Sequence, residues 1–119
     1  MKYFARICMV SMGFSVLSMP ISSAIADPGK AVRTVLAEDD KFQAFEIRQK
    51  PGEVNTPSTS GTRVIRALSG GALLRTYADG KTERSDWKTG EVQIQGPGPQ
   101  YTVTNVGDTE VVLYVVRLK

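Results

Sequence analysis

Residues 90–105 read Gly-Glu-Val-Gln-Ile-Gln-Gly-Pro-Gly-Pro-Gln-Tyr-Thr-Val-Thr-Asn, and this stretch decides the fold. Residues 92–95 form a short strand-like run after the turn at Thr89-Gly90. The sequence Gly-Pro-Gly-Pro at 96–99 then blocks regular structure, because proline lacks the amide donor that a helix or a sheet needs. Residues 101–106 are rich in β-branched side chains and predict a second strand. Strand, stiff turn and strand therefore follow one another.

Short strands and turns continue on both sides of this stretch. Further strands are predicted over residues 31–37, 42–48, 63–68, 72–77, 81–87 and 110–118. Asp79-Gly80 is a strong hairpin signal because both residues tolerate positive φ, and residues 55–61 form a loop by composition. No segment of residues 27–119 shows capped helical periodicity, so we expect one all-β domain, an antiparallel sandwich or small barrel.

The last predicted strand is apolar on both of its faces. Val111, Leu113 and Val115 point to one side, and the side chains at 112, 114 and 116, which are valine or tyrosine, point to the other. We therefore expect both faces of this strand to be buried. Either a neighbouring sheet covers the second face, or another copy of the chain does, and we expect a homodimer.

The N-terminus has the order of a secretory signal peptide. Lys2 and Arg6 give a basic start, residues 7–19 are uncharged and largely apolar, and Ala24-Ile25-Ala26 supplies small residues at the positions a signal peptidase reads. The apolar run is shorter than the roughly 20 residues that a membrane-spanning helix needs. We therefore predict cleavage after Ala26 and a secreted or periplasmic protein that does not contact the membrane after processing.

Composition excludes several kinds of chemistry. The 119 residues contain no histidine, which removes the commonest general base and metal ligand, and the one cysteine, Cys8, allows no intramolecular disulfide. Removing residues 1–26 leaves thirteen basic against twelve acidic residues, a net charge of +1. A nearly neutral domain is a poor candidate for nucleic-acid binding, which depends on neutralising phosphates.

The spacing of residues 90–105 resembles the second signature of the cupin family, in which a glycine is followed by proline, glycine, histidine and asparagine. Gly90, Gly98 and Asn105 stand at the family's intervals, with Gly96 in place of the proline and Tyr101 in place of the histidine. This signature and the first signature of the family, described next, together span just over half of residues 27–119. The resemblance implies a cupin-type double-stranded β-helix, or jelly-roll barrel.

The first signature of the family ends in a glutamate, six residues and a glycine. Counting back from Gly70 places Arg63 at the glutamate position. The two histidines that precede it in the family would fall at Pro57 and Thr59, or at Ser58 and Ser60 if the count runs forward from Gly52.

Members of the family carry a metal site, and the residues at the corresponding positions of this chain differ from its ligands. Cupins bind a divalent metal through three histidines and the glutamate, whereas serine, threonine, proline, Arg63 and Tyr101 are poor neutral ligands, and the arginine adds a positive charge. We therefore predict no metal and no cofactor. In the family's register Arg63 and Tyr101 point into the barrel, with Thr59 or Ser58 on the same side, and an arginine fork beside a phenol suits a small polar or anionic ligand.

A structural role is the alternative for these residues. Arg63 could pair internally with Glu83, Glu91 or Asp86, and Tyr101 could be a core aromatic. Arg48, Lys50, Arg66 and Arg75 are interpreted as a solvated sheet face.

Three functions are therefore open. The first is a metal-free binding module for a small polar or anionic organic molecule. The second is a lyase or isomerase in which Tyr101 transfers protons and Arg63 holds the substrate. The third is a structural or interaction protein that forms a homodimer around a filled barrel.

Overall fold

The computed structural model describes residues 29–119. The predicted signal peptide, residues 1–26, and its cleavage site after Ala26 lie outside the described residues. Within residues 29–119 the chain forms strands and turns, with no helix, so the expected all-β architecture is confirmed. That part of the chain accordingly holds no helix long and apolar enough to cross a membrane.

Nine strands make up the described chain. In sequence order they are β1 (Val32–Glu38), β2 (Phe42–Gln49), β3 (Val54–Asn55), β4 (Arg63–Ser69), β5 (Gly71–Tyr77), β6 (Thr82–Trp87), β7 (Val92–Gln95), β8 (Tyr101–Asn105) and β9 (Val111–Leu118). Eight of them match the predicted segments closely. The exception is β3, which begins one residue before the segment expected to be a loop and pairs with β8 through Val54 and Asn55.

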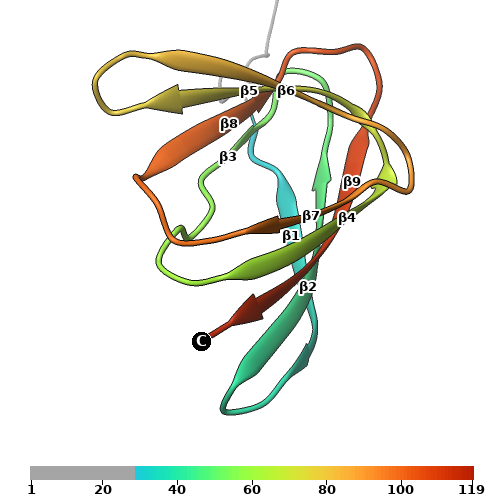
Figure 1. Ribbon diagram of the computed structural model, residues 1–119. Helices are drawn as coiled ribbons and strands as arrows, with labels where there is room; N and C mark the ends of the chain where they lie inside the picture. Colours follow the sequence, from blue (N-terminus) through green and yellow to red (C-terminus); the bar gives the residue numbers. More distant parts are fainter. Residues whose placement is uncertain (1–28) are drawn as a thin grey trace, which may run out of the picture.

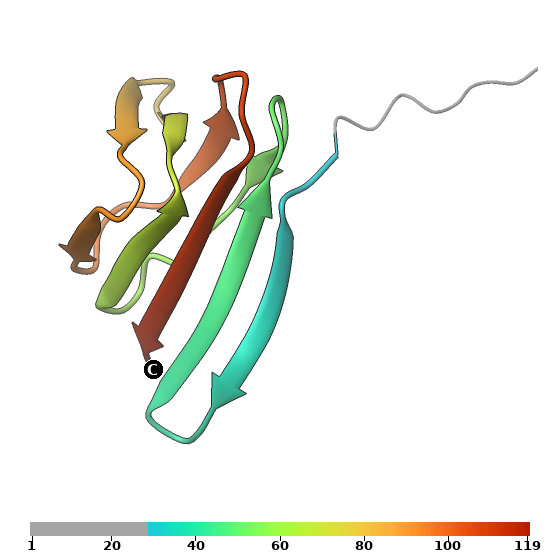
Figure 2. The ribbon, with the colours of Figure 1, turned by 90° about the vertical axis from the view of Figure 1, so that its right-hand side faces the viewer.

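The strands form two antiparallel sheets that face each other. The five-stranded sheet has the order β1-β2-β9-β4-β7, and the four-stranded sheet has the order β3-β8-β5-β6. Figure 1 shows the two layers, and Figure 2 shows β1, β2, β9 and β4 running side by side. Neighbours such as β2 and β9 are far apart in the sequence, so most of the sheet is held by long-range pairing.

The predicted hairpin at Asp79-Gly80 joins β5 to β6. Gly80 has a φ of 89°, which a residue without a side chain adopts at little cost. Its amide donates to the carbonyl oxygen of Tyr77, and the Asp79 carboxylate accepts from the amide of Lys81. The turn therefore forms as the sequence predicts.

The core lies between the sheets. Its buried apolar side chains are Phe45, Ile47, Ile65, Ala67, Leu73, Trp87, Tyr101, Val103, Val111, Leu113 and Val115. Two buried amides tie the layers together at one end. The Asn105 side chain donates to the carbonyl oxygens of Gln49 and Thr109, and the Gln49 side chain donates to those of Glu53 and Val103. These bonds connect β2 of one sheet to β8 of the other.

The outer face of the five-stranded sheet is mixed, with one apolar row beside a row that includes Glu46 and Arg66. One cross-strand row runs through Ala37, Ala44, Val116, Val64 and Ile94, on β1, β2, β9, β4 and β7 in turn. Ile94 is 74% exposed and Val64 is 41% exposed. On the outer face of β9, Val112 is buried and Tyr114 and Val116 are half-buried, so the expected burial of this face is partly met within the described chain.

Candidate functional site

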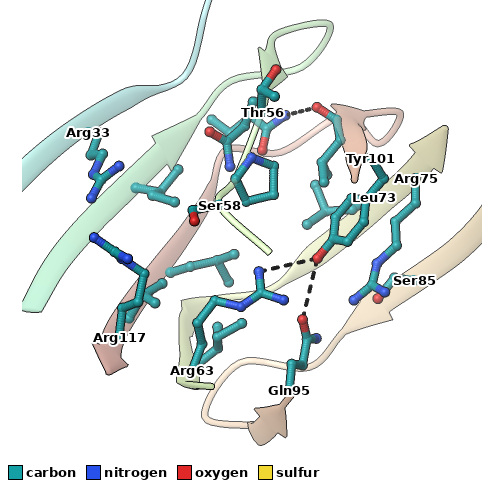
Figure 3. A pocket seen from close by; sticks show the side chains of 18 of the residues that line it. Arg33, Thr56, Ser58, Arg63, Leu73, Arg75, Ser85, Gln95, Tyr101 and Arg117 are labelled. Carbon is teal, nitrogen blue, oxygen red and sulfur yellow. Dashed lines mark hydrogen bonds between the residues drawn. The ribbon is translucent and has the colours of Figure 1, made fainter. Parts of the chain in front are cut away.

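The space between the sheets holds an inner cavity of about 60 Å³. Apolar core side chains from both sheets form much of its wall, including Phe45, Ile65, Leu73 and Trp87. Four arginines, Arg33, Arg63, Arg75 and Arg117, line the same cavity (Figure 3), and no aspartate or glutamate is among its lining residues within the described chain.

Arg63 is the most deeply buried of these arginines. Strand β4 alternates buried and exposed side chains, which turns Arg63, Ile65 and Ala67 inward, and Arg63 is only 5% exposed. Its Nη1 donates to the hydroxyl oxygen of Tyr101 at 3.3 Å, whereas its buried Nε has no hydrogen-bond partner. A buried donor without a partner is costly, so this atom marks a place where an acceptor would be stabilising.

The acidic residues proposed as internal partners of Arg63 are engaged elsewhere. Glu83 pairs with Arg75 at 3.6 Å, and Asp86 pairs with Arg84 at 2.9 Å. Glu91 accepts from the amide of Lys88, and this bond is the main reason why the pKa of Glu91 lies below its usual range. Among residues 29–119 Arg63 forms no ion pair, so the structure does not show the internal ion pair of the structural alternative.

Tyr101 lies at the centre of the site. Its ring forms part of the buried core, and its hydroxyl donates weakly to Gln95 Oε1 at 3.5 Å while accepting from Arg63 (Figure 3). The guanidinium of Arg75 lies over the same ring, 4.5 Å from its centroid. The structure therefore brings Arg63 and Tyr101 together, and it adds Arg75, which the sequence did not suggest.

Arg75 was expected on a solvated face with Arg48, Lys50 and Arg66, and that expectation is wrong for this residue. Strand β5 pairs Arg75 with Val103, a core residue of β8, and this register turns the arginine inward. The error has a local cause. Leu73 and Leu74 are adjacent, so the sequence is compatible with either phase of the alternation.

Arg117 and Arg33 complete the cationic lining and were also missed. Arg117 continues the inward phase of Val111, Leu113 and Val115 on β9, so the alternation of that strand could have revealed it. Arg33 lies on the edge strand β1, with its guanidinium 3.9 Å from the ring centroid of Phe45. Sequence alternation gives little guidance there, because every residue of β1 is exposed.

Arg33 and Arg117 share one neutral acceptor. Both guanidinium groups donate to the side-chain oxygen of Gln43, and the Gln43 amide donates to Glu38. Glu38 is itself bound by the ammonium of Lys119 at 2.6 Å, and this contact is the main cause of its lowered pKa, with smaller contributions from Gln43 and Arg117. No direct ion pair joins a carboxylate to Arg33 or Arg117 in the described chain.

An outer pocket of about 500 Å³ adjoins the inner cavity. The two share Arg63, Arg75, Ser85, Gln95 and Tyr101 as a common wall. The serine and the threonine expected near Arg63 lie in different cavities. Ser58 lines the inner cavity, and the buried Thr59 lines the outer pocket.

Comparison with known proteins identifies the fold. A cupin domain from Bordetella pertussis is 24% identical with a TM-score of 0.70, over 79% of this chain and 98% of that one. An uncharacterized Klebsiella pneumoniae protein with a double-stranded β-helix domain is 19% identical with a TM-score of 0.60, over 85% of this chain and 90% of that one. A cupin superfamily protein from Desulfitobacterium hafniense is 16% identical with a TM-score of 0.58, over 80% and 83% of the two chains. No family model and no curated protein matches the chain.

The chain therefore has the cupin fold, as the spacing of its glycines implied. The residues at the family's metal-binding positions do not fit a divalent cation. Arg63 presents nitrogen donors and a fixed positive charge, and Tyr101 accepts its hydrogen bond. A cation would face guanidinium groups from both sheets, so what this site can do chemically is hold a negative charge.

Proposed function

We propose that this protein is a metal-free cupin-like domain that binds a small polar or anionic organic molecule inside its barrel. In this proposal Arg63 and Tyr101 hold the charged or polar end of the ligand, with Ser58 and Thr59 contributing hydroxyl groups from the two sides. The basic, apolar and small-residue order of residues 1–26 supports a secreted or periplasmic location.

One observation carries the proposal: Arg63 is buried beside a cavity, and no described residue gives it a carboxylate partner or gives its Nε an acceptor. Desolvating a guanidinium is expensive unless an opposite charge lies next to it. A bound anion would supply both the charge and the acceptor. Charge-assisted hydrogen bonds of this kind are about twice as strong as bonds between neutral groups.

The two cavities suit the two ends of an organic ligand. The inner cavity offers the cationic groups, and the outer pocket offers space together with polar side chains such as Thr59, Gln93 and Gln95. Because Arg63 and Tyr101 belong to both walls, a ligand can bind them from the outer pocket. The volume of about 500 Å³ there also favours a binding role over a barrel filled by its own side chains.

A thermal-shift screen of the purified protein tests the proposal. Small carboxylic acids and phosphate compounds are expected to raise Tm, since a ligand at a hundred times its Kd stabilises the native state by about 2.7 kcal/mol. The effect should disappear in Arg63→Met and persist in Arg66→Met, whose arginine lies exposed on the same strand. If no acid raises Tm, or if Arg63→Met responds like the wild type, the proposal is wrong.

A lyase or isomerase is the second candidate, since the Tyr101 hydroxyl lies on the wall that both cavities share. Tyr101→Phe distinguishes the two. A binding module keeps most of its affinity, because Arg63 is still present. An enzyme that uses the phenol for proton transfer converts no ligand once the hydroxyl is removed, and product analysis of the wild type with each bound acid shows whether conversion occurs at all.

We further propose that the protein is a homodimer that pairs through the outer face of the five-stranded sheet. The row of Ala37, Ala44, Val116, Val64 and Ile94 is continuous across all five strands, and such a face fits a second copy of itself about a twofold axis. Ile94→Glu is expected to give a monomer in analytical ultracentrifugation. Val106→Glu is the control, because Val106 is also exposed but lies in the turn between β8 and β9. A wild-type monomer, or a dimer that survives Ile94→Glu, would contradict the proposal.

A further inference from the structure

A row of polar side chains crosses the inner face of the five-stranded sheet from edge to edge. It runs Glu38, Gln43, Arg117, Arg63 and Gln95, each residue paired in register with the next, on β1, β2, β9, β4 and β7. Its only carboxylate stands at the β1 edge and is bound by Lys119. The two arginines stand next to each other in the middle.

Adjacent like charges are unfavourable in a sheet. Directly paired residues on neighbouring antiparallel strands have Cβ atoms about 4.5–5.5 Å apart, and like charges at that spacing repel. Arg63 and Arg117 are such a pair, and the Nε atoms of both are buried without a hydrogen-bond partner. Both arginines line the inner cavity, so two guanidinium charges border the same space.

The pairing of Arg63 with Arg117 determines which chemical groups can bind between the two guanidinium groups. The occupant must accept from two guanidinium groups on neighbouring strands and must carry more than one negative charge to balance them. Arg33 lies beside Arg117 at the shared acceptor Gln43, and Arg75 lies on the opposite sheet beside Tyr101, so guanidinium groups line the cavity on more than one side (Figure 3). A carboxylate has two oxygens in one plane and a single charge. A phosphoryl group has three acceptor oxygens that are not coplanar and a charge of about −1.5 to −2.

We propose that the anionic end of the ligand is a phosphoryl group that bridges Arg63 and Arg117 in the inner cavity. This inference rests on the proposed function and narrows its ligand to a phosphate compound. The cavity of about 60 Å³ has room for such a group, and the organic part of the ligand would extend past Arg63 and Tyr101, whose side chains line both cavities, into the outer pocket.

Calorimetric titration with inorganic phosphate and with acetate, at matched ionic strength, tests this. Phosphate is expected to bind at least tenfold more tightly than acetate. Arg117→Met should weaken phosphate binding at least tenfold and leave the weak binding of acetate nearly unchanged, because Arg63 still serves a carboxylate. Arg66→Met should change neither. If Arg117→Met does not fold, as judged by circular dichroism, Arg117→Gln takes its place.

The two proposals fail in different ways. If acetate binds as tightly as phosphate and its binding depends on Arg63 but not on Arg117, the proposal of a phosphoryl ligand is wrong, whereas the proposed anion-binding function is supported. If phosphate binds equally to the wild type and to Arg117→Met, the bridge is wrong. If neither anion binds, both proposals fail.

Discussion

Arg63→Met is expected to raise the Tm of the ligand-free protein. Methionine fills a similar elongated volume among Ile65 and the other core residues without a charge, and replacing buried charged groups by apolar ones often stabilises by about 1–4 kcal/mol. The lost bond from Arg63 to the Tyr101 hydroxyl offsets part of this gain. A net gain of about 1–2 kcal/mol corresponds to a Tm higher by roughly 5–15 °C for a domain of this size.

The reason for this expectation is functional. A group that destabilises the free protein and is satisfied only by a ligand is typical of a binding site, where stability is lower than the fold allows. Arg66→Met, on the exposed face of β4, should change the stability by no more than about 0.5 kcal/mol. A Tm of Arg63→Met below that of the wild type would mean that Arg63 supports the fold, and the structural interpretation would return.

Gly70→Ala is expected to disrupt the fold. Gly70 lies at the corner between β4 and β5, and a Cβ atom there would stand 2.2 Å from the carbonyl oxygen of Trp87 and 2.8 Å from the amide nitrogen of Thr89. Both are backbone atoms, so no side chain can rotate away, and the corner itself must open. We expect a loss of about 3 kcal/mol, the upper end of overpacking costs, and a Tm lower by roughly 12–24 °C.

Gly96→Ala is the matched control, because a Cβ atom at Gly96 meets nothing within 4 Å. Its thermal unfolding should match that of the wild type within about 0.5 kcal/mol. If the two variants unfold at the same temperature, the close approach at the β4–β5 corner does not constrain the fold as described.

The strands and turns could be predicted from the sequence because their signals are local. The hairpin at Asp79-Gly80 needs only its own residues. The intervals of the two signatures, counted on from Gly90 and back from Gly70, correctly implied the cupin fold and placed Tyr101 beside Arg63. Strand β3 could not be predicted in the same way. It has two residues in a segment rich in proline, serine and threonine, and it exists because β8 pairs with it.

The cationic lining of the barrel was only partly predictable. A strand has two faces, and the sequence fixes which of them is buried only where apolar and polar residues alternate clearly. That condition does not hold for β4, where Arg63 and Arg66 lie on opposite faces, and Arg63 was placed correctly because the register of the cupin signature turns it inward. It also fails on β5, where Leu73 and Leu74 are adjacent, and Arg75 was assigned to the wrong face. The pairing of Arg117 with Arg63 depends on contact between β9 and β4, which are far apart in the sequence.

The central claim is that the buried Arg63 binds an anion inside the barrel. The Nε–H group of Arg63 is a direct probe of that binding. Its resonance can be followed in a ¹H–¹⁵N correlation spectrum and assigned by its absence in Arg63→Met. The account predicts that inorganic phosphate shifts this resonance downfield along a saturable curve as Nε gains an acceptor, with the exposed Arg66 unchanged. A shift that never saturates and is equal at Arg63 and Arg66 would show only a general salt effect, and the anion site would be contradicted.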